Sequence, residues 1–274
     1  MFAQNPDVLR NFYKVKRTTI SMMRLRGYDT SEEDALNIFG VASVSNIIRF
    51  RTHYTEEKSN YYLNTGSFAS SLNNIYYKIN KDTGEKTDTT LVYFFDRPGD
   101  VGKAKDKKGK KKDDRIYTTQ VKELFQSYVE YIKGILNEKG KTIEKYIIVL
   151  PVPLNSTSQN RILESINDVE FFDWNFLIHE NINFHKYVPH YHKLTEKEKK
   201  ELFNGFLPSN LPKILISNPH NVFDNKKQPD VVKYYDPLAK YNGWQPGDVI
   251  KFTSFTPAST FLIQKTVEYR IVTY

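Results

Sequence analysis

The pattern of hydrophobic and polar positions begins with helical spacing. Residues 8–26 predict an amphipathic helix with a basic outer face that ends at Gly27. A second helix is expected after Thr30, because Thr30 and Glu33 have the spacing of a capping box. The apolar stripe of the first helix consists of Val8, Phe12, Val15, Thr19, Met22 and Met23.

The next segments mix strand and helix patterns. Residues 43–54 look strand-like, and residues 73–95 read as two strands around a polar turn near Gly84. Residues 118–140 have helical spacing, and 145–154 form a continuous apolar run of the length of a buried strand. This order predicts an α/β first domain with helices packed on a mixed sheet.

The α/β pattern gives way near Phe172, where we place a domain boundary. A short helix is expected over 155–167, and the aromatic run 171–184 looks extended. A capped helix from Thr195, a turn at 246–248 and a final strand then predict a small mixed domain. The fold class is thus α+β or α/β, with domains over 1–172 and 173–274.

Composition indicates a folded protein. At 274 residues, with 39% hydrophobic and 14% aromatic residues, the chain can form two domains with their own cores. The absence of cysteine excludes disulfides, thiolate metal sites and cysteine nucleophiles. No run has the length of a membrane span and the first residues lack signal-peptide order, so we expect an intracellular protein.

The net charge is uneven. Forty Lys+Arg against 32 Asp+Glu give +8, and much of this excess lies in the lysine-rich insert 102–115. A solvated loop explains such a run, and a contact with a polyanion such as nucleic acid is the other interpretation.

Three of the six histidines, His185, His190 and His192, stand close together. His190 and His192 would share one face of a strand, with His185 or Glu180 as a third ligand. A kink at 188–189 and the absence of any recognised ligand spacing argue against a site. We expect no metal.

Other catalytic signals are weak. The segment 99–104 lacks the glycine spacing of a phosphate loop, and 56–58 and 229–230 are mere fragments of the carboxylate–lysine set of a nuclease. We therefore expect no catalytic residue and no cofactor.

The motifs in the last third of the chain resemble, in their order, those of a known protein family. Residues 185–214 resemble the run H-x-x-V-P-x-H, capped helix and L-P-K-I of the fifth-subunit family shared by eukaryotic RNA polymerases I, II and III, which has an archaeal counterpart. Residues 234–252 and 269–272 resemble its D-P-x-A-R-Y-x-G, G-D-V-V-K-I and Y-R-x-V motifs. The resemblance implies contact with the largest polymerase subunit through His185, Val188, Pro189, Leu211, Pro212, Ile214, Asp236, Pro237, Tyr241, Gly247, Asp248, Tyr269 and Arg270.

The first third is similar to the same family's opening helix, which ends in R-G-Y. This similarity is carried by Arg17, Thr18, Met22, Arg26, Gly27 and Tyr28. Residues 92–103 and 145–154 look like two of the family's strands. Three departures are the lysine-rich insert, an insert at 220–234, and a loop at 253–265 that lacks the usual arginine and glycine.

The resemblance implies a non-catalytic subunit of a multisubunit DNA-directed RNA polymerase. It implies an N-terminal jaw domain with a nuclease-like fold beside downstream double-stranded DNA, and a C-terminal assembly domain on the largest subunit. Basic side chains would then lie near DNA phosphates without reading sequence. They are Arg10, Lys14, Lys16, Arg17 and Arg24 of the first helix, and Lys103, Lys105, Lys107, Lys108, Lys110, Lys111 and Lys112 of the insert.

Alternatives remain beside this interpretation. A nuclease-like DNA-binding protein or active nuclease would use the same jaw-like fold, and a metal-binding interaction module would use the histidines. The inserts and the Lys/Asn/Tyr-rich composition suggest a large DNA virus, with a protist as the other source. A viral protein is expected in virions and cytoplasmic factories, and a cellular one in the nucleus.

Overall fold

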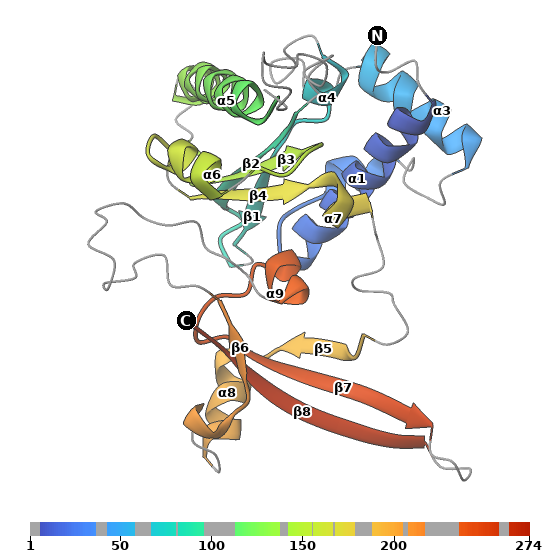
Figure 1. Ribbon diagram of the computed structural model, residues 1–274. Coiled ribbons are helices and arrows are strands. Elements are labelled where there is room, and N and C mark those ends of the chain that lie inside the picture. The colour runs from blue at the N-terminus through green and yellow to red at the C-terminus, as the bar shows by residue number, and fades with distance from the viewer. Residues whose placement is uncertain are drawn as a thin grey trace. The chain divides into compact units, whose positions relative to one another are not determined.

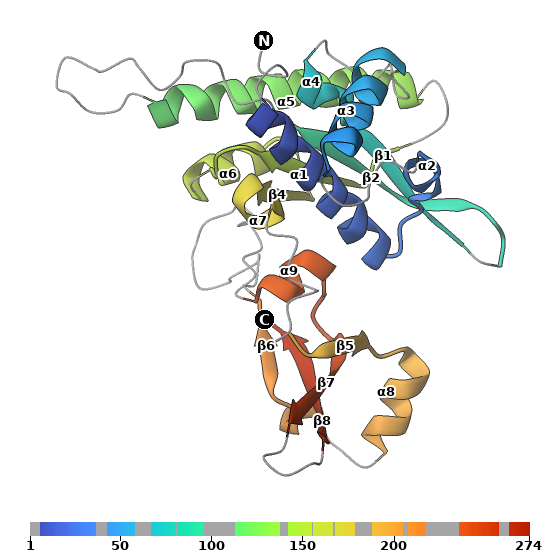
Figure 2. The same cartoon turned by 90° about the vertical axis from the view of Figure 1, so that its right-hand side faces the viewer.

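The computed structural model divides into two compact units that are described separately (Figures 1 and 2). The first holds the elements up to residue 178, and the second those from residue 188. Whether these units are the predicted jaw and assembly domains stays a prediction. The structure describes residues 6–36, 43–57, 67–80, 82–95, 113–137, 142–154, 156–166, 168–178, 188–204, 208–216, 236–257 and 263–274.

The first unit is built around a four-stranded mixed sheet of order β1-β2-β3-β4. β1 and β2 are antiparallel, and the β2–β3 and β3–β4 pairs are parallel. Its strands are β1 (Asn74–Ile79), β2 (Lys86–Phe94), β3 (Lys145–Leu150) and β4 (Val169–Asp173). Its helices are α1 (Pro6–Leu25), α2 (Ser31–Ala35), α3 (Val44–Thr52), η2 (His53–Glu57), α4 (Phe68–Ser71), α5 (Asp113–Asn137), α6 (Ser156–Leu163) and α7 (Trp174–Ile178).

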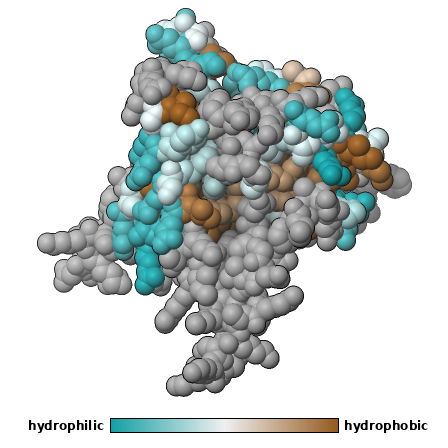
Figure 3. All heavy atoms as spheres, turned by 90° about the horizontal axis from the view of Figure 1, so that it is seen from above, coloured by the Kyte–Doolittle hydropathy of each residue, from teal (hydrophilic) through white to brown (hydrophobic). Residues whose placement is uncertain are grey.

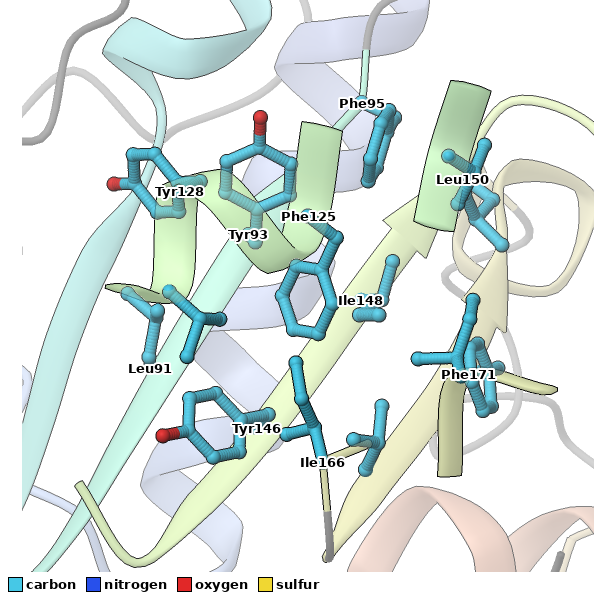
Figure 4. Packing of buried hydrophobic residues seen from close by; sticks show 14 of the residues in the cluster. Leu91, Tyr93, Phe95, Phe125, Tyr128, Tyr146, Ile148, Leu150, Ile166 and Phe171 are labelled. Carbon is cyan, nitrogen blue, oxygen red and sulfur yellow. The ribbon is translucent and has the colours of Figure 1, made fainter. Parts of the chain in front are cut away.

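Helices cover both faces of this sheet, as Figures 1 and 2 show: α5 and α6 on one face, α1 and α7 on the other. Strand residues are buried on both faces, as expected for a sheet with two helical layers. Under α5, Phe125 points onto the sheet among Tyr93, Tyr146 and Ile148 (Figure 4). The predicted helices on a mixed sheet are therefore confirmed.

Residues 43–54 are helical, so their strand-like prediction is wrong. They form α3 and continue into η2. Ser43 caps the helix by accepting a hydrogen bond from the Asn46 backbone N–H at 3.3 Å. Ile47, Phe50 and Tyr54 are buried, and their spacing of three and four residues is that of one helical face.

Two further local predictions need correction. The aromatic run after residue 171 is extended only through β4, and continues as α7. At α2, the helix starts after Thr30 as predicted, but Thr30 makes no side-chain capping bond. The capping box of Thr195 and Glu198, by contrast, is present in both directions.

The second unit contains another four-stranded mixed sheet, of order β5-β7-β8-β6. β5–β7 and β7–β8 are antiparallel, and β6–β8 is parallel. α9 covers one face, where Ala239 and Trp244 pack on Ile250, Phe252 and Val272. The elements are β5 (His190–Lys193), α8 (Glu196–Phe203), η5 (Pro208–Asn210), β6 (Lys213–Leu215), α9 (Pro237–Asn242), β7 (Val249–Pro257) and β8 (Ile263–Thr273).

The β7–β8 hairpin is longer than its neighbours. β5 pairs with β7 only as far as Thr253, and β6 pairs with β8 only over 271–273. The hairpin therefore extends beyond both edge strands as a two-stranded ribbon (Figure 1). Among the helices the structure describes, none is long and apolar enough to cross a membrane.

Candidate functional site

The R-G-Y motif at the end of α1 joins the helix to the sheet. Arg26 donates to both carboxylate oxygens of Glu170 in β4, at 3.1 and 2.9 Å. Gly27 has φ +84°, a left-handed conformation suited to glycine after a helix end. The Tyr28 hydroxyl donates to Asp88 at 3.0 Å and accepts from Thr90 at 2.8 Å. These residues have structural roles within the first unit.

The D-P motif of the second unit starts α9. The Asp236 carboxylate accepts from the backbone N–H groups of Leu238 and Ala239, at 2.7 and 3.1 Å. Pro237 follows in the first turn of the helix, where its missing N–H costs nothing. Asp236 is therefore an N-cap, and its side chain is occupied within the unit.

The G-D motif forms the turn before β7. Gly247 has φ +90°, and its N–H donates to the Val272 carbonyl at 2.9 Å. The buried Asp248 carboxylate accepts from the Gln245 N–H at 2.9 Å and lies 2.7 Å from Lys193 Nζ. Like Asp236, these two residues hold the fold together.

The other predicted partner-binding residues differ in exposure. Ile214 and Tyr241 are buried, whereas Pro212 and Pro237 are exposed. Arg270 bonds Glu268 on the same strand at 2.9 and 3.1 Å. Val188, Pro189, Leu211, Tyr269 and Arg270 are half-buried. His185 lies outside the described residues, and contact of this set with a partner stays a prediction.

His190 and His192 lie on one face of β5 and are exposed. His192 Nε2 is 3.2 Å from each carboxylate oxygen of Glu198. Hydrogen bonds from the backbone and side chain of Thr195, followed by that from His192, lower the pKa of Glu198 to about 2. Within the described ranges no three His or acidic residues are grouped to hold a metal; Glu180 and His185 fall outside those ranges.

The predicted DNA-proximal residues of α1 do not share one environment. Arg10, Lys14 and Arg17 recur at helical spacing on its outer side, with Arg10 exposed and the other two half-buried. Arg24 forms an ion pair with Asp34. Lys16 is fully buried on the opposite side, so its predicted phosphate contact is wrong. The insert lysines 103–112 lie outside the described residues.

Lys16 belongs to a buried polar cluster of Lys16, Glu33, Tyr54 and Tyr76 that the sequence analysis missed. Lys16 Nζ lies 2.5 Å from Glu33 Oε1 and donates to the Leu72 carbonyl at 2.8 Å. The Tyr76 hydroxyl donates to the other Glu33 oxygen at 2.5 Å, and Tyr54 also hydrogen-bonds to Glu33. The cluster therefore ties together α1, α2, η2 and β1.

Burial controls the ionisation of this cluster. It lowers the pKa of Lys16, while the adjacent Glu33 carboxylate opposes the shift. Burial, then the charge of Glu33, raises the pKa values of Tyr54 and Tyr76 well above the usual range. A buried lysine beside a carboxylate resembles catalytic chemistry. However, the Lys16 side chain is 0% exposed and that of Glu33 only 7%, so neither offers a substrate an approach.

A sequence signal for this cluster existed. Lys16 stands four residues after Phe12 and one after Val15, inside the apolar stripe of the helix. A charged residue at such a position requires a partner, because an unpaired buried charge is very costly.

The sequence is similar to a known protein across nearly the whole chain. No family model matches the sequence. The chain is 24% identical over 250 residues to a protein of Arabidopsis thaliana named DNA-directed RNA polymerase subunit 5-like protein 1, and the match covers 89% of each chain. This similarity suggests the fifth-subunit family of RNA polymerases.

Proposed function

We propose that this chain is a non-catalytic subunit of a multisubunit DNA-directed RNA polymerase. The observation that carries the proposal is the similarity to the Arabidopsis subunit 5-like protein over 250 residues. A match covering 89% of both chains favours a shared role for the whole molecule over a shared fragment.

The buried cluster supports a role without catalysis. The ionisable groups of Lys16 and Glu33 are used to join elements of the first unit and are closed to solvent. Nucleotide addition would belong to the partner subunits. The alternative of an active nuclease predicts Mg²⁺-dependent cleavage of duplex DNA by the isolated chain.

We propose that the second unit docks on the largest polymerase subunit. Asp236, Gly247 and Asp248 would act indirectly by stabilising the fold of this unit, because their polar groups form hydrogen bonds within it. Direct contact would come from exposed or half-buried residues such as Pro212 and Tyr269.

The first unit would then lie near downstream double-stranded DNA. Arg10 and Lys14 have neither an ion pair nor a hydrogen bond to the described part of the chain, and Arg17 follows on the same side of α1. Such cations bind phosphates without reading sequence, and the released counterions make binding salt-dependent.

Polymerase assembled with Arg10→Gln and Lys14→Gln tests this contact. The salt slope of duplex DNA binding should fall by up to about 2, because each phosphate contact contributes about 0.9. The matched variant Lys197→Gln with Lys200→Gln removes two exposed charges from α8 and should keep the wild-type slope. Equal slopes in all three proteins would reject the contact.

The inserts and the Lys/Asn/Tyr-rich composition support a proposal about the source, with a protist as the alternative. We propose a large DNA virus, so that the protein would work in cytoplasmic factories and enter virions; detection in the nucleus of an uninfected cell would oppose this.

Depletion tests the function itself. Removing the tagged chain from an extract of the cells that make it should also remove promoter-dependent RNA synthesis, and adding back the purified complex should restore it. RNA synthesis that persists at the original level after complete depletion would refute the proposal, and DNA cleavage by the isolated chain would favour the nuclease.

A further inference from the structure

The sheet of the second unit has two different faces. Residues paired across neighbouring strands point to the same side, so the register assigns each residue to a face. Ile250 and Phe252 lie on the inner face, with α9. Lys251 and Tyr269 are paired on the other side, which we name the outer face, and Lys251 Nζ lies 6.0 Å from the centre of the Tyr269 ring.

An apolar line runs along β8 on the outer face. It consists of Val267, Tyr269 and Ile271, which alternate along the strand and span about 14 Å at ~3.4 Å per residue. Leu215 of the neighbouring β6 adds to one end. Val267 is 41% exposed and Leu215 50% exposed, so large aliphatic groups remain in solvent on the described surface.

Lysines border this line. The register sets Lys213 of β6 opposite Ile271, and Lys251 of β7 opposite Tyr269. Lys265 precedes Val267 by two residues on the same strand and therefore shares its face. Among the outer-face strand residues whose side chains the structure describes, none is acidic. They are His190, His192, Lys213, Leu215, Val249, Lys251, Thr253, Lys265, Val267, Tyr269, Ile271 and Thr273.

Part of the outer face is already covered. His192 of β5 contacts Glu198 of α8, and Val249 is fully buried. The exposed part therefore lies around Val267 of β8, where β6 no longer pairs with the strand, and beside it are the half-buried Tyr269 and Lys251. Val267 remains 41% exposed and Tyr269 is only half-buried, and exposed apolar groups that lie next to each other can mark an interaction site.

Exposed hydrophobic residues of the first unit are scattered, unlike the line along β8. Val44 and Ile48 of α3, and Leu124 and Tyr131 of α5, are more than half exposed. On the face seen from above, hydrophobic residues lie in separate patches among hydrophilic ones (Figure 3). Scattered exposure of this kind is common in folded proteins, so it does not by itself indicate a docking site.

We propose that the outer face, defined by Lys213, Leu215, Lys251, Lys265, Val267, Tyr269 and Ile271, docks an acidic protein segment with alternating aliphatic side chains. Charge complementarity identifies the partner: three lysines flank the apolar line, and the strand residues of that face supply no negative charge. The aliphatic groups favour protein over single-stranded nucleic acid, which stacks its bases on aromatic rings. The proposal deepens, and rests on, the docking role given above.

Fluorescence anisotropy with the full chain tests the surface. The probe is a labelled ten-residue peptide of alternating Glu and Val, compared with a Lys–Val peptide and with oligo-dT of ten nucleotides. We expect the Glu–Val peptide to bind at least tenfold more tightly than the Lys–Val peptide, with affinity falling as salt rises. Preferential binding of oligo-dT, or equal binding of both peptides, would overturn the proposal.

Charge reversal locates the site. Lys251→Glu with Lys265→Glu should weaken Glu–Val binding at least tenfold, whereas Lys197→Glu with Lys200→Glu on α8, with the same change in net charge, should stay within twofold. Val267→Thr keeps the β-branched shape and should weaken binding severalfold by removing apolar contact. Circular dichroism melts check that each variant is folded, and equal weakening by both reversals would reject the outer face.

Purification from cells separates this inference from the proposed function. If wild type recovers polymerase subunits and the Lys251→Glu, Lys265→Glu variant does not, both stand. If both proteins recover them equally, the outer face is refuted while the function survives. If wild type itself recovers none, the proposed function fails.

Discussion

The buried ion pair of Lys16 and Glu33 gives the most quantitative prediction. Replacing Lys16 by Met keeps an unbranched side chain as far as the ε position, but it leaves the Glu33 carboxylate buried without its counter-charge. Breaking a buried pair in this way costs about 3–5 kcal/mol of unfolding free energy. Glu33 keeps the hydrogen-bond donors Tyr54 and Tyr76, so we expect the unfolding free energy to fall by about 3 kcal/mol, at the lower end of this range.

The double variant Lys16→Met, Glu33→Met should cost less than the two single changes together. It removes both charges at once, but it leaves the Tyr54 and Tyr76 hydroxyls and the Leu72 carbonyl without their present partners. Each such buried polar group costs about 1–3 kcal/mol. We therefore expect a total of about 3–5 kcal/mol, against at least ~6 kcal/mol for the sum of the two single changes, and so a favourable coupling of at least ~1 kcal/mol between the two sites.

Urea unfolding followed by tryptophan fluorescence measures these values. Trp174 packs on Phe12 in the first unit, with ring centres 4.6 Å apart, and Trp244 lies in the core of the second unit. A Trp244→Phe background therefore makes the signal report the first unit. The control Lys14→Met, on the outer side of the same helix, should change stability by less than about 0.5 kcal/mol. A loss below about 1 kcal/mol for Lys16→Met, or strict additivity of the two changes, would show that Lys16 and Glu33 do not form a coupled buried ion pair.

Further predictions concern Glu198, the glycines Gly27 and Gly134, and Asp236. The folded pKa of Glu198 is about 2, below its ordinary value of 4.5, so its capping contribution to stability is present above pH 4.5 and should fade as the pH drops towards 2. Amide hydrogen exchange in α8 measures this pH dependence, and Glu198→Gln should flatten it. Gly27→Ala should lower the unfolding free energy by about 1 kcal/mol, because φ at this position is +84°. Gly134→Ala inside α5 should raise it by about 0.5–1 kcal/mol, because an added methyl group meets nothing within 4 Å, and thermal melts measure both changes. Asp236→Ala should cost the second unit about 1 kcal/mol as a lost N-cap, with Asp236→Asn largely restoring it, and an unchanged melt would contradict the capping role.

The strongly periodic elements could be predicted from the sequence. The apolar stripe of α1, the paired strands β1 and β2 and the capping box of α8 all have local signals. These elements follow from side-chain spacing within a single segment, which is the information that periodicity contains.

Elements whose signal depends on distant partners could not be predicted. Thr30–Glu33 and Thr195–Glu198 have the same spacing, yet Glu33 turns inward to Lys16 while Glu198 caps its own helix. The difference arises because Lys16 is buried by α1 packing, which is tertiary information. For the same reason α3 was predicted as a strand: its buried face depends on contacts with α1.

Some residues of the candidate site could be predicted from the sequence, and others could not. Motifs identified Asp236, Gly247 and Asp248 as important, and the structure gives the cause as a helix cap and a turn. The outer face was not found, because Lys213, Lys251 and Val267 are far apart in the sequence and only the strand register brings them together.

Affinity purification of the tagged chain from the cells that make it, followed by quantitative mass spectrometry, decides whether the chain is a polymerase subunit. We expect two very large RNA polymerase subunits to be recovered in one-to-one ratio with the chain and to stay bound at physiological salt. Recovery of the chain alone under the same gentle conditions would contradict this expectation.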